Sequence, residues 1–273
     1  MLSTLEKAGR VLRLFTAHNP EWGVSEVARK LSIPKTSAHD ALTTLTQIGL
    51  VHRMVTGRYR LGFMIVPLHA VLMAQTPWRL VAHEEMERLA VLLQEPLHLM
   101  AFDGGHAICI DLVEGDGDPP LVRVGDVLPA YASASGKVFL ASRSQEEVRR
   151  VCARMQAFTP NTIVSLDELQ SELARIRERG YGLDIEESNS GRSAIGAPIY
   201  NANGEIIAAV TIAAATPRFE RHKSLWLQEL LAATHVISER LGYQPDPGEG
   251  RLHWHLVEGQ EKLRQAPRNQ RKS

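Results

Sequence analysis

Two short stretches near the start of the chain carry apolar residues at helical spacing, one on each side of a proline. The first places them at i, i+3, i+4 and i+7, and the second continues the same three- and four-residue spacing. The inward positions are Val24, Val27, Ala28 and Leu31, followed by Ala38, Ala41, Leu42, Leu45 and Ile48. The pattern predicts two short amphipathic helices joined by a tight turn.

The residues at the ends of both helices agree with this prediction. Ser25 can cap the first helix through its hydroxyl, and Pro34 ends it because the residue before a proline is pushed out of the helical region. Gly49 stands where a left-handed residue commonly ends a helix. Residues 50–53 and 58–61 alternate as strands around a Thr-Gly turn, which predicts a hairpin. Two helices, a turn and a hairpin are the outline of a winged helix-turn-helix.

The outward side of the second helix begins with short polar and charged residues, which can reach the phosphates and base edges of DNA. Basic residues of the hairpin can add phosphate contacts. The expected DNA-contacting residues are Ser25, Lys35, Thr36, Ser37, His39, Asp40, Thr43, Arg53 and Arg58. The alternative is an ordinary three-helix core with a hairpin, because helix-turn-helix geometry also occurs in proteins that never touch DNA.

The distribution of charge helps to decide between these alternatives. Residues 1–75 hold nine Lys and Arg residues and four acidic residues, a formal charge of +5, and the whole chain is formally neutral, which leaves −5 for the remainder. A basic head on an acidic body fits phosphate binding by the head alone. We therefore expect the head to bind double-stranded DNA.

Two further helical stretches flank this module. The core face expected for the first is Leu5, Ala8, Val11, Leu12 and Phe15. After the hairpin, residues 63–73 are apolar with few charges, and we expect a linker helix there, kinked at Pro67. An apolar linker suggests packing against a second subunit, and the alternative is that it packs on its own domain.

The body of the chain mixes helices and strands, which predicts an α+β domain with a sheet flanked by helices. Expected helices cover residues 78–94, 145–154, 166–179 and 220–241, and a loop runs into a further helix within residues 125–141. Expected strands cover residues 96–102, 107–113, 121–124, 181–186, 193–200 and 205–214. Turns rich in Gly, Asp and Asn join two pairs of these strands into hairpins.

Composition is that of an ordinary globular protein. The chain has 273 residues, enough for two domains, and 44% of them are apolar. It has no run of about 18 apolar residues, the length that a transmembrane helix needs, and its charged N-terminus does not resemble a signal peptide, so we expect a cytoplasmic protein. Cys109 and Cys152 stand in apolar contexts and are expected to be buried free thiols, with a disulfide or redox switch as the alternative.

No group of residues in the sequence assembles into a catalytic or metal site. His83 and Glu84 lack the second histidine of a metalloprotease helix, and Ser133 and Lys137 lack the Ser-x-x-Lys spacing of a serine nucleophile. Residues 134–136 open a helix, whose free N–H groups could hold a small carboxylate. The alternative is a tight turn that merely needs small residues.

Many short blocks recur in a characteristic order and spacing. In the head they are residues 31–39 (LSIPKTSAH), 42–45 (LTTL), 49–51 (GLV) and 59–62 (YRLG). In the body they are residues 128–129 (LP), 134–137 (ASGK), 140–141 (LA), 159–163 (TPNTI), 177–181 (RERGY), 186–187 (EE) with Gly191, 197–199 (API) and 203–204 (NG). Together they resemble the IclR family of bacterial transcription regulators, over about residues 4–241.

The resemblance implies a winged-helix head at residues 1–62, a linker helix at 63–76 and a GAF-like effector-binding domain at 77–243, before a flexible basic tail at 244–273. It also implies a homodimer, or a dimer of dimers, on a pseudo-palindromic operator, with a small organic acid as effector. The family's pocket positions fall on Leu128, Ala134, Ser135, Asp184, Arg192, Ala194 and Thr211. Ser135 and its neighbouring N–H groups would hold a carboxylate, Asp184 and Thr211 would bond hydroxyl groups, and Leu128 and Ala194 would supply apolar walls.

Three residues depart from the usual family pattern. Asp40 stands where a basic residue is usual, and it either repels phosphate or accepts from cytosine N4, so we expect a changed operator. Ala194 stands where a cysteine is frequent. Arg192 replaces an apolar pocket residue, and it could clamp a carboxylate if it points inward or be a surface charge if it points outward.

The sequence therefore predicts a ligand-responsive, DNA-binding transcriptional regulator with no cofactor, metal or membrane partner. We expect it to repress a catabolic operon. The alternative is an enzyme that processes a small acid and uses the helix-turn-helix as a docking module, and the missing catalytic set argues against it.

Overall fold

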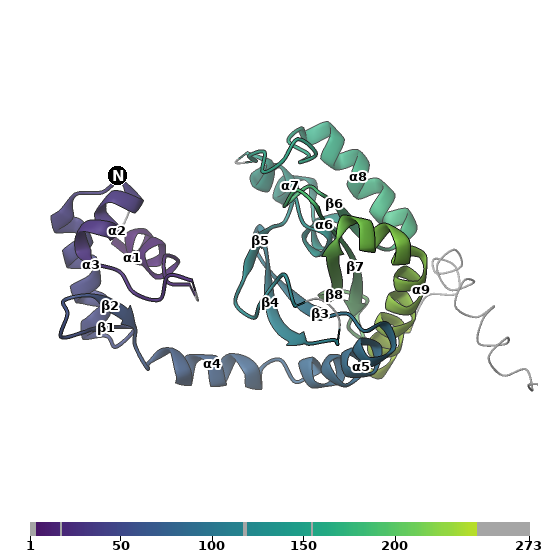
Figure 1. The fold of residues 1–273 in the computed structure, drawn as a ribbon, viewed down its shortest axis with the longest axis horizontal. Helices are drawn as coiled ribbons and strands as arrows, with labels where there is room; N and C mark the ends of the chain where they lie inside the picture. Colours follow the sequence, from purple (N-terminus) through teal and green to yellow (C-terminus); the bar gives the residue numbers. More distant parts are fainter. Residues whose placement is uncertain (1–3, 17, 117–118, 154, 245–273) are drawn as a thin grey trace, which may run out of the picture. The chain divides into compact units, whose positions relative to one another are not determined.

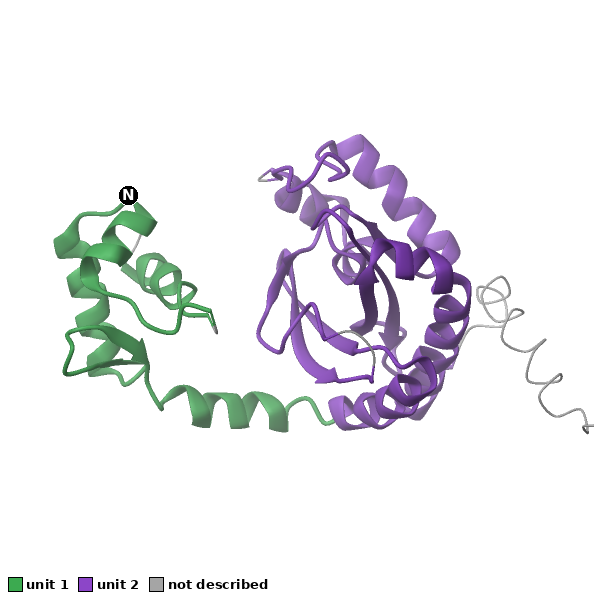
Figure 2. Cartoon of the chain, viewed as in Figure 1, with its two compact units in different colours: residues 1–77 green, residues 78–273 purple. Residues whose placement is uncertain are grey.

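The computed structural model describes residues 4–16, 18–116, 119–153 and 155–244. The chain divides into two compact units, Met1–Pro77 and Trp78–Ser273 (Figure 2). Predictions for residues 245–273, which include nearly all of the expected basic tail, lie outside the described residues.

The N-terminal unit begins with three helices followed by a two-stranded hairpin (Figure 1). Its elements are α1 (Thr4–Leu12), α2 (Val24–Leu31), α3 (Lys35–Gln47), β1 (Val51–Arg53) and β2 (Tyr59–Leu61). The two strands pair antiparallel, and Gly57 adopts a left-handed conformation in the turn between them. The elements of the predicted winged helix-turn-helix are present in the expected order.

Apolar side chains from all five elements meet in one core. Its buried members include Val11, Val27, Leu42, Leu45, Val51 and Tyr59. Two residues expected to face inward do not: Leu5 is 85% exposed and Ile48 is 55% exposed. Each stands at an end of its helix, where no further core-facing turn follows. The helical spacing was correct, but it was extended one position too far at both places.

The start of α2 differs from the prediction that Ser25 caps it. The helix begins two residues earlier, with Gly23 as its N-cap, so Ser25 lies inside the first turn and is exposed. The Glu26 carboxylate accepts a hydrogen bond from the Gly23 amide at 2.8 Å. At the other end, Ser32 takes a left-handed conformation (φ 53°) before Pro34, so the turn between α2 and α3 is made without glycine.

A further helix of the same unit, α4 (Ile65–Ala74), has no buried residue. Four of its large apolar side chains are exposed by about half or more: Val66 by 60%, Leu68 by 51%, Val71 by 59% and Leu72 by 53%. The helix begins at Ile65, so Pro67 falls in the first turn, where the amides have no intrahelical acceptor. A proline there breaks no helical hydrogen bond, which removes the reason for the expected kink.

The C-terminal unit is built on one six-stranded antiparallel sheet in the order β5-β4-β3-β8-β7-β6. Its strands are β3 (Leu97–Asp103), β4 (His106–Val113), β5 (Val127–Pro129), β6 (Gly182–Ile185), β7 (Arg192–Tyr200) and β8 (Ile206–Ala215). The central pair, β3 and β8, joins two hairpins that are far apart in sequence. A mixed sheet and helix unit of this kind confirms the predicted α+β class.

Helices cover both faces of this sheet (Figure 1). One face packs on α5 (Trp78–Leu93) and α9 (Thr216–Arg240), through a core that includes Met86, Leu97, Ile212 and Trp226. The other face packs on α6 (Ala134–Ala141), α7 (Gln145–Cys152) and α8 (Leu166–Arg179), through a core that includes Met100, Phe139, Val148 and Leu173.

The region between β4 and α6 was predicted incorrectly. Residues 121–124 were expected to form a strand but do not, and β5 forms a few residues later, in a stretch expected to be a loop. The Cys109 backbone of β4 bonds to the residues that follow this segment: its carbonyl accepts from the Gly125 amide at 2.8 Å, and its amide donates to the Asp126 carbonyl at 3.0 Å. Leu121 and Val122 are half-buried in a loop, while Val124 is 57% exposed, so the apolar residues of this segment do not mark a strand.

Both cysteines are free thiols. Cys109 is buried in β4, and desolvation raises the pKa of its thiol to about 12. Cys152, at the end of α7, is only partly buried, although burial also raises the pKa of its thiol. The expectation of a buried free thiol is confirmed for Cys109 and holds in part for Cys152.

Candidate DNA-binding surface and effector site

The start of α3 presents one polar face to solvent. Lys35, Thr36, His39 and Asp40 are exposed, while Ser37 and Thr43 are half-buried. The exposed residues recur every three to four positions because the opposite side of the helix, through Ala38, Ala41, Leu42 and Leu45, is buried in the core of the unit. The helix surface available to a partner is therefore the one that the sequence predicted.

Asp40 lies within this face with 80% of its side chain exposed. Its nearest charged neighbour is His39, whose Nδ1 lies 3.8 Å from the carboxylate. A contact this long between exposed groups fixes neither side chain. Asp40 is therefore free to meet a base edge or to repel a phosphate.

The arginines of the hairpin differ in what they can reach. Arg53 and Arg60 are exposed. Arg58 instead turns back onto the start of α2, where its guanidinium donates to both Glu26 carboxylate oxygens at 3.2 and 2.9 Å. It also donates to the Glu21 carbonyl at 2.9 Å. Arg58 is predicted to contact DNA; its side chain is 40% exposed, and its guanidinium is already hydrogen-bonded to these acceptors.

We expect Arg58→Ala to lower the melting temperature of the N-terminal unit by a few degrees. The guanidinium joins the hairpin to α2 through a bidentate carboxylate pair and a carbonyl, and such pairs are the stronger class of ion pair. Arg60→Ala removes an exposed charge from the same hairpin and should leave the melting temperature unchanged. Equal melting temperatures for the two variants, by circular dichroism, would contradict the role assigned to Arg58.

In the C-terminal unit, strand register brings several predicted pocket residues to the same side of the sheet. Asp184 pairs with Ala194, and Thr211 pairs with Gly196, two residues further along β7. Directly paired residues of antiparallel strands point the same way, as do residues two apart. These four residues therefore share the face that packs on α6, where Ala134 and Ser135 are also buried.

Glycines let α6 approach this face closely. A Cβ at Gly196 would lie 3.0 Å from the Ser135 amide nitrogen and 3.2 Å from the Thr211 Oγ1. A Cβ at Gly182 would lie 2.2 Å from the Ala134 carbonyl oxygen. The first turn of α6 thus rests directly on β6 and β7, with the Thr211 hydroxyl beside it.

Two amides in the first turn of α6 have no acceptor inside the helix. Ser133 is the N-cap, and its hydroxyl oxygen accepts from the Gly136 amide at 3.3 Å, while the Lys137 amide bonds to the Ser133 carbonyl at 3.0 Å. This leaves the Ala134 and Ser135 amides as donors with no acceptor inside the helix. Amides at a helix N-terminus favour an anion, so a carboxylate can bind there.

Asp184 is already held by its own loop. Its carboxylate accepts from the Glu187 amide at 2.7 Å, the Ser188 amide at 3.3 Å and the Ser188 hydroxyl at 2.5 Å. Desolvation by burial raises the pKa of Asp184, and these hydrogen bonds oppose the rise. Asp184 thus orders residues 184–188, which limits its capacity to bond a ligand hydroxyl.

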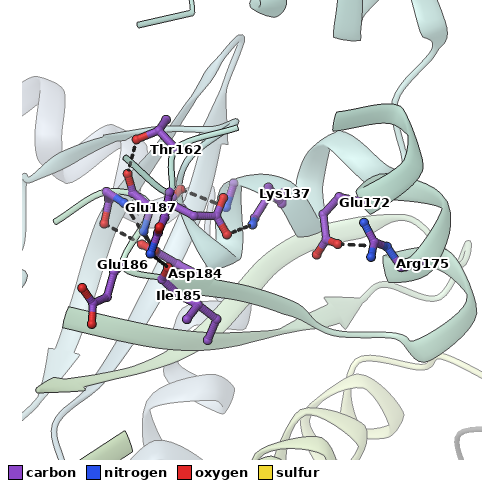
Figure 3. A network of polar contacts seen from close by, with 12 residues as sticks. Lys137, Thr162, Glu172, Arg175, Asp184, Ile185, Glu186 and Glu187 are labelled. Carbon is purple, nitrogen blue, oxygen red and sulfur yellow. Dashed lines mark hydrogen bonds and ion pairs between the residues drawn. The ribbon is translucent and has the colours of Figure 1, made fainter. Parts of the chain in front are cut away.

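The same loop carries a buried ion pair (Figure 3). The Lys137 ammonium group donates from α6 to the Glu187 carboxylate, and the two side chains are 1% and 10% exposed. Thr159 and Thr162 donate to the Glu186 and Glu187 carbonyl oxygens, both at 2.6 Å. The pair and these hydrogen bonds tie α6 to the segment around residue 160.

Two predicted pocket residues stand apart from this group. Arg192 is exposed at the start of β7, which favours its interpretation as a surface charge. Leu128 is half-buried on the short strand β5 at the other edge of the sheet. The predicted pocket residues of the sheet that share the face covered by α6 are Ala194, Thr211 and Asp184, and Asp184 is bonded to its own loop.

Two family models match the chain. One, described as the IclR helix-turn-helix domain, matches residues 4–54, and the other, described as bacterial transcriptional regulator IclR C-terminal, matches residues 71–239. The second match alone covers more than half of the chain. The chain belongs to the IclR family. It is a DNA-binding transcriptional regulator, and its relatives in the family are regulators rather than enzymes.

Relatives and solved structures agree with this assignment. The HTH-type transcriptional regulator XynR of Escherichia coli (strain K12) is 29% identical over 248 residues, which span 89% of this chain and 98% of XynR. The HTH-type transcriptional repressor AllR of the same strain is 27% identical over 251 residues, which span 89% and 92%. The crystal structure of the Thermotoga maritima IclR matches with a TM-score of 0.63 at 31% identity, covering 88% of this chain and 99% of that chain.

One buried polar residue of this IclR-family chain was not among the predicted site residues. His98 on β3 is 1% exposed and pairs with Thr211, so it faces the same side of the sheet as the predicted pocket residues. The available signal was a single histidine inside the apolar run of residues 97–102. Without the register between β3 and β8, nothing connected that histidine to Thr211.

Other classes of site find no support in the part of the chain that the structure describes. No cluster of three or more His, Cys, Asp or Glu side chains there could hold a metal ion. Nor does any helix within those residues combine the length and the apolar character needed to cross a bilayer.

Proposed function

We propose that this IclR-family regulator represses a catabolic operon, and that a small organic acid bound at the start of α6 changes its affinity for the operator. Operator binding by the N-terminal unit is supported by the exposed polar face of α3, from Lys35 to Asp40, on a unit with a formal charge of +5. Repression is supported by the relative AllR, which is named a repressor. Such a regulator of a bacterial operon works in the cytoplasm.

The proposed state is a homodimer. The exposed apolar side chains of α4 support it, because a helix with four large apolar residues in water gains from burial against a second copy. A two-fold dimer presents two heads to DNA, so its operator has pseudo-palindromic symmetry. A dimer of dimers would bind two such sites.

The proposed effector is a carboxylate held by the Ala134 and Ser135 amides, with Ala194 and Thr211 beside it. Asp184 positions the loop behind the site, and Leu128, on β5 at the opposite edge of the sheet, is not part of it. An acid bound there can change DNA affinity only if it binds one state of the dimer more tightly than the other. The close packing of α6 on β6 and β7 gives a small ligand the means to favour one position of that helix.

Binding to DNA from upstream of its own gene should weaken steeply with salt. Each phosphate contact releases about one counterion, so the slope of log affinity against log salt counts the contacts. Lys35→Ala should reduce that slope by about one and weaken binding several-fold, measured by fluorescence anisotropy from about 50 to 200 mM salt. Lys7→Ala removes the same charge from α1 and should change the slope less.

The same DNA should give a symmetric footprint of two half-sites separated by a multiple of the helical repeat. Salt-independent binding, or equal effects of Lys35→Ala and Lys7→Ala on the slope, would overturn the assignment of α3 as the recognition helix. An asymmetric single half-site would overturn the homodimer on a pseudo-palindrome.

A further inference from the structure

Two polar atoms on the α6-facing side of the sheet lack a hydrogen-bond partner among the described residues. They are the Nε2 of His98 and the Oγ1 of Thr211, both fully buried atoms. The two residues are paired neighbours on β3 and β8. Buried polar atoms in folded proteins are almost always paired, so two orphans side by side need an explanation.

The protonation of His98 follows from its surroundings. Its Nδ1 lies 3.3 Å from the Thr211 carbonyl oxygen, which can only accept, so we assign the ring proton to Nδ1. Desolvation lowers the pKa of His98, and although the Thr211 and Val122 carbonyls and the Asp126 charge oppose this, the ring is neutral at pH 7. A neutral ring with its proton on Nδ1 leaves Nε2 as an acceptor that has no hydrogen-bond partner among the described residues.

The position of Thr211 connects this acceptor to the start of α6. The Thr211 Oγ1 and the Ser135 amide nitrogen lie 3.2 and 3.0 Å from the same point, where a Cβ at Gly196 would stand. They are therefore at most about 6 Å apart, a span that a molecule of a few heavy atoms covers. One end of the site offers N–H donors to an anion, and the other end offers a hydroxyl and a bare imidazole nitrogen.

We propose that His98 and Thr211 contact the effector directly, and that the effector is a hydroxycarboxylate rather than a plain carboxylate. This inference rests on the proposed acid site at α6. The carboxylate lies on the Ala134 and Ser135 amides, and the hydroxyl of the same molecule donates to His98 Nε2 and accepts from Thr211 Oγ1. A plain carboxylate leaves both groups unpaired and binds more weakly.

Matched pairs of acids test this preference. Isothermal titration calorimetry on the full chain compares glycolate with acetate, lactate with propionate, and 4-hydroxybenzoate with benzoate. In at least one pair the hydroxylated acid should bind about tenfold more tightly, because a buried acceptor that stays unpaired disfavours the other acid.

Two variants identify the atoms responsible. In His98→Asn the side-chain amide can still donate to the Thr211 carbonyl, as Nδ1 does, but nothing replaces Nε2. This variant should lose most of the tenfold preference, with affinity for the plain acid changed less than about twofold. His98→Gln, whose amide reaches the position of Nε2, should retain more of the preference, and Thr211→Val should reduce it as His98→Asn does.

The outcomes separate this inference from the function on which it rests. Equal affinity within every pair, or a preference that survives in His98→Asn, overturns the contact assigned to His98 while leaving an acid site in place. Binding that follows the predicted preference without changing operator affinity overturns the proposed regulation instead. If no acid of the three pairs binds at about 10 mM, both are overturned.

Discussion

Lys137→Met is expected to destabilise the C-terminal unit by roughly 3–5 kcal/mol, the usual cost of removing one partner of a buried ion pair. Methionine keeps most of the volume of the lysine side chain, so the loss comes from charge rather than from a cavity. Glu187 would remain buried without its cationic partner, and its Oε2 already lacks a hydrogen-bond partner among the described residues.

The variant should also raise the pKa of Glu187 further. Desolvation already raises it, and the Lys137 charge is the largest influence that opposes the rise. Urea unfolding followed by circular dichroism measures the loss of stability. The double variant Lys137→Met, Glu187→Leu should return to within about 1 kcal/mol of the wild type, because a buried ion pair can be replaced by apolar residues at little cost.

A surface pair of the same unit provides the control. Arg150 and Glu146 are 70% and 82% exposed and lie 3.8 Å apart on α7. Arg150→Ala should therefore change stability by less than about 0.5 kcal/mol. A loss below about 1 kcal/mol for Lys137→Met would mean that Glu187 finds water or another partner, and that the pair does not fix α6.

Gly182→Ala is the second substitution for which we expect a large effect, about 3 kcal/mol of lost stability. The added Cβ would stand 2.2 Å from the Ala134 carbonyl oxygen and 3.1 Å from its carbonyl carbon. Both are backbone atoms of α6, so no side chain can rotate away and the helix itself must move. Because α6 carries the proposed carboxylate site, acid binding should weaken as well.

Gly9→Ala in α1 is the opposite case. A Cβ there meets nothing within 4 Å, and alanine favours a helix over glycine by up to about 1 kcal/mol. This variant should raise the free energy of unfolding of the N-terminal unit, which contains α1. If Gly182→Ala unfolds at the wild-type urea concentration and leaves acid binding intact, close packing of α6 is not what the glycine provides.

The parts of the fold that sequence predicted well are those governed by neighbouring residues. Helix spacing around Val27 and Leu42, the break before Pro34 and the left-handed Gly49 depend on a few adjacent positions each. The resemblance to a known family supplied the order of the domains, which periodicity alone does not provide.

Some contacts of the predicted site residues could not be read from the sequence, mostly because the partner lies far along the chain. Arg58 stays a predicted DNA contact, but its hydrogen bonds to Glu26, 32 residues away, could not be predicted. His98 was overlooked because its neighbour Thr211 is 113 residues away. Asp184 stays a predicted pocket residue; its hydrogen-bond partners follow within four residues, but they depend on how the loop folds.

The contact between Arg58 and Glu26 bears on the design of chimeric regulators. It joins the hairpin to α2, and the exposed face of α3 takes no part in it. Replacing Lys35, Thr36, His39 and Asp40 with the residues of another family member would leave the Arg58–Glu26 contact intact. Exchanging the hairpin alone would break this contact unless residues 26 and 58 are exchanged together. The boundaries of a chimera that exchanges the DNA-binding module should therefore lie outside residues 21–61.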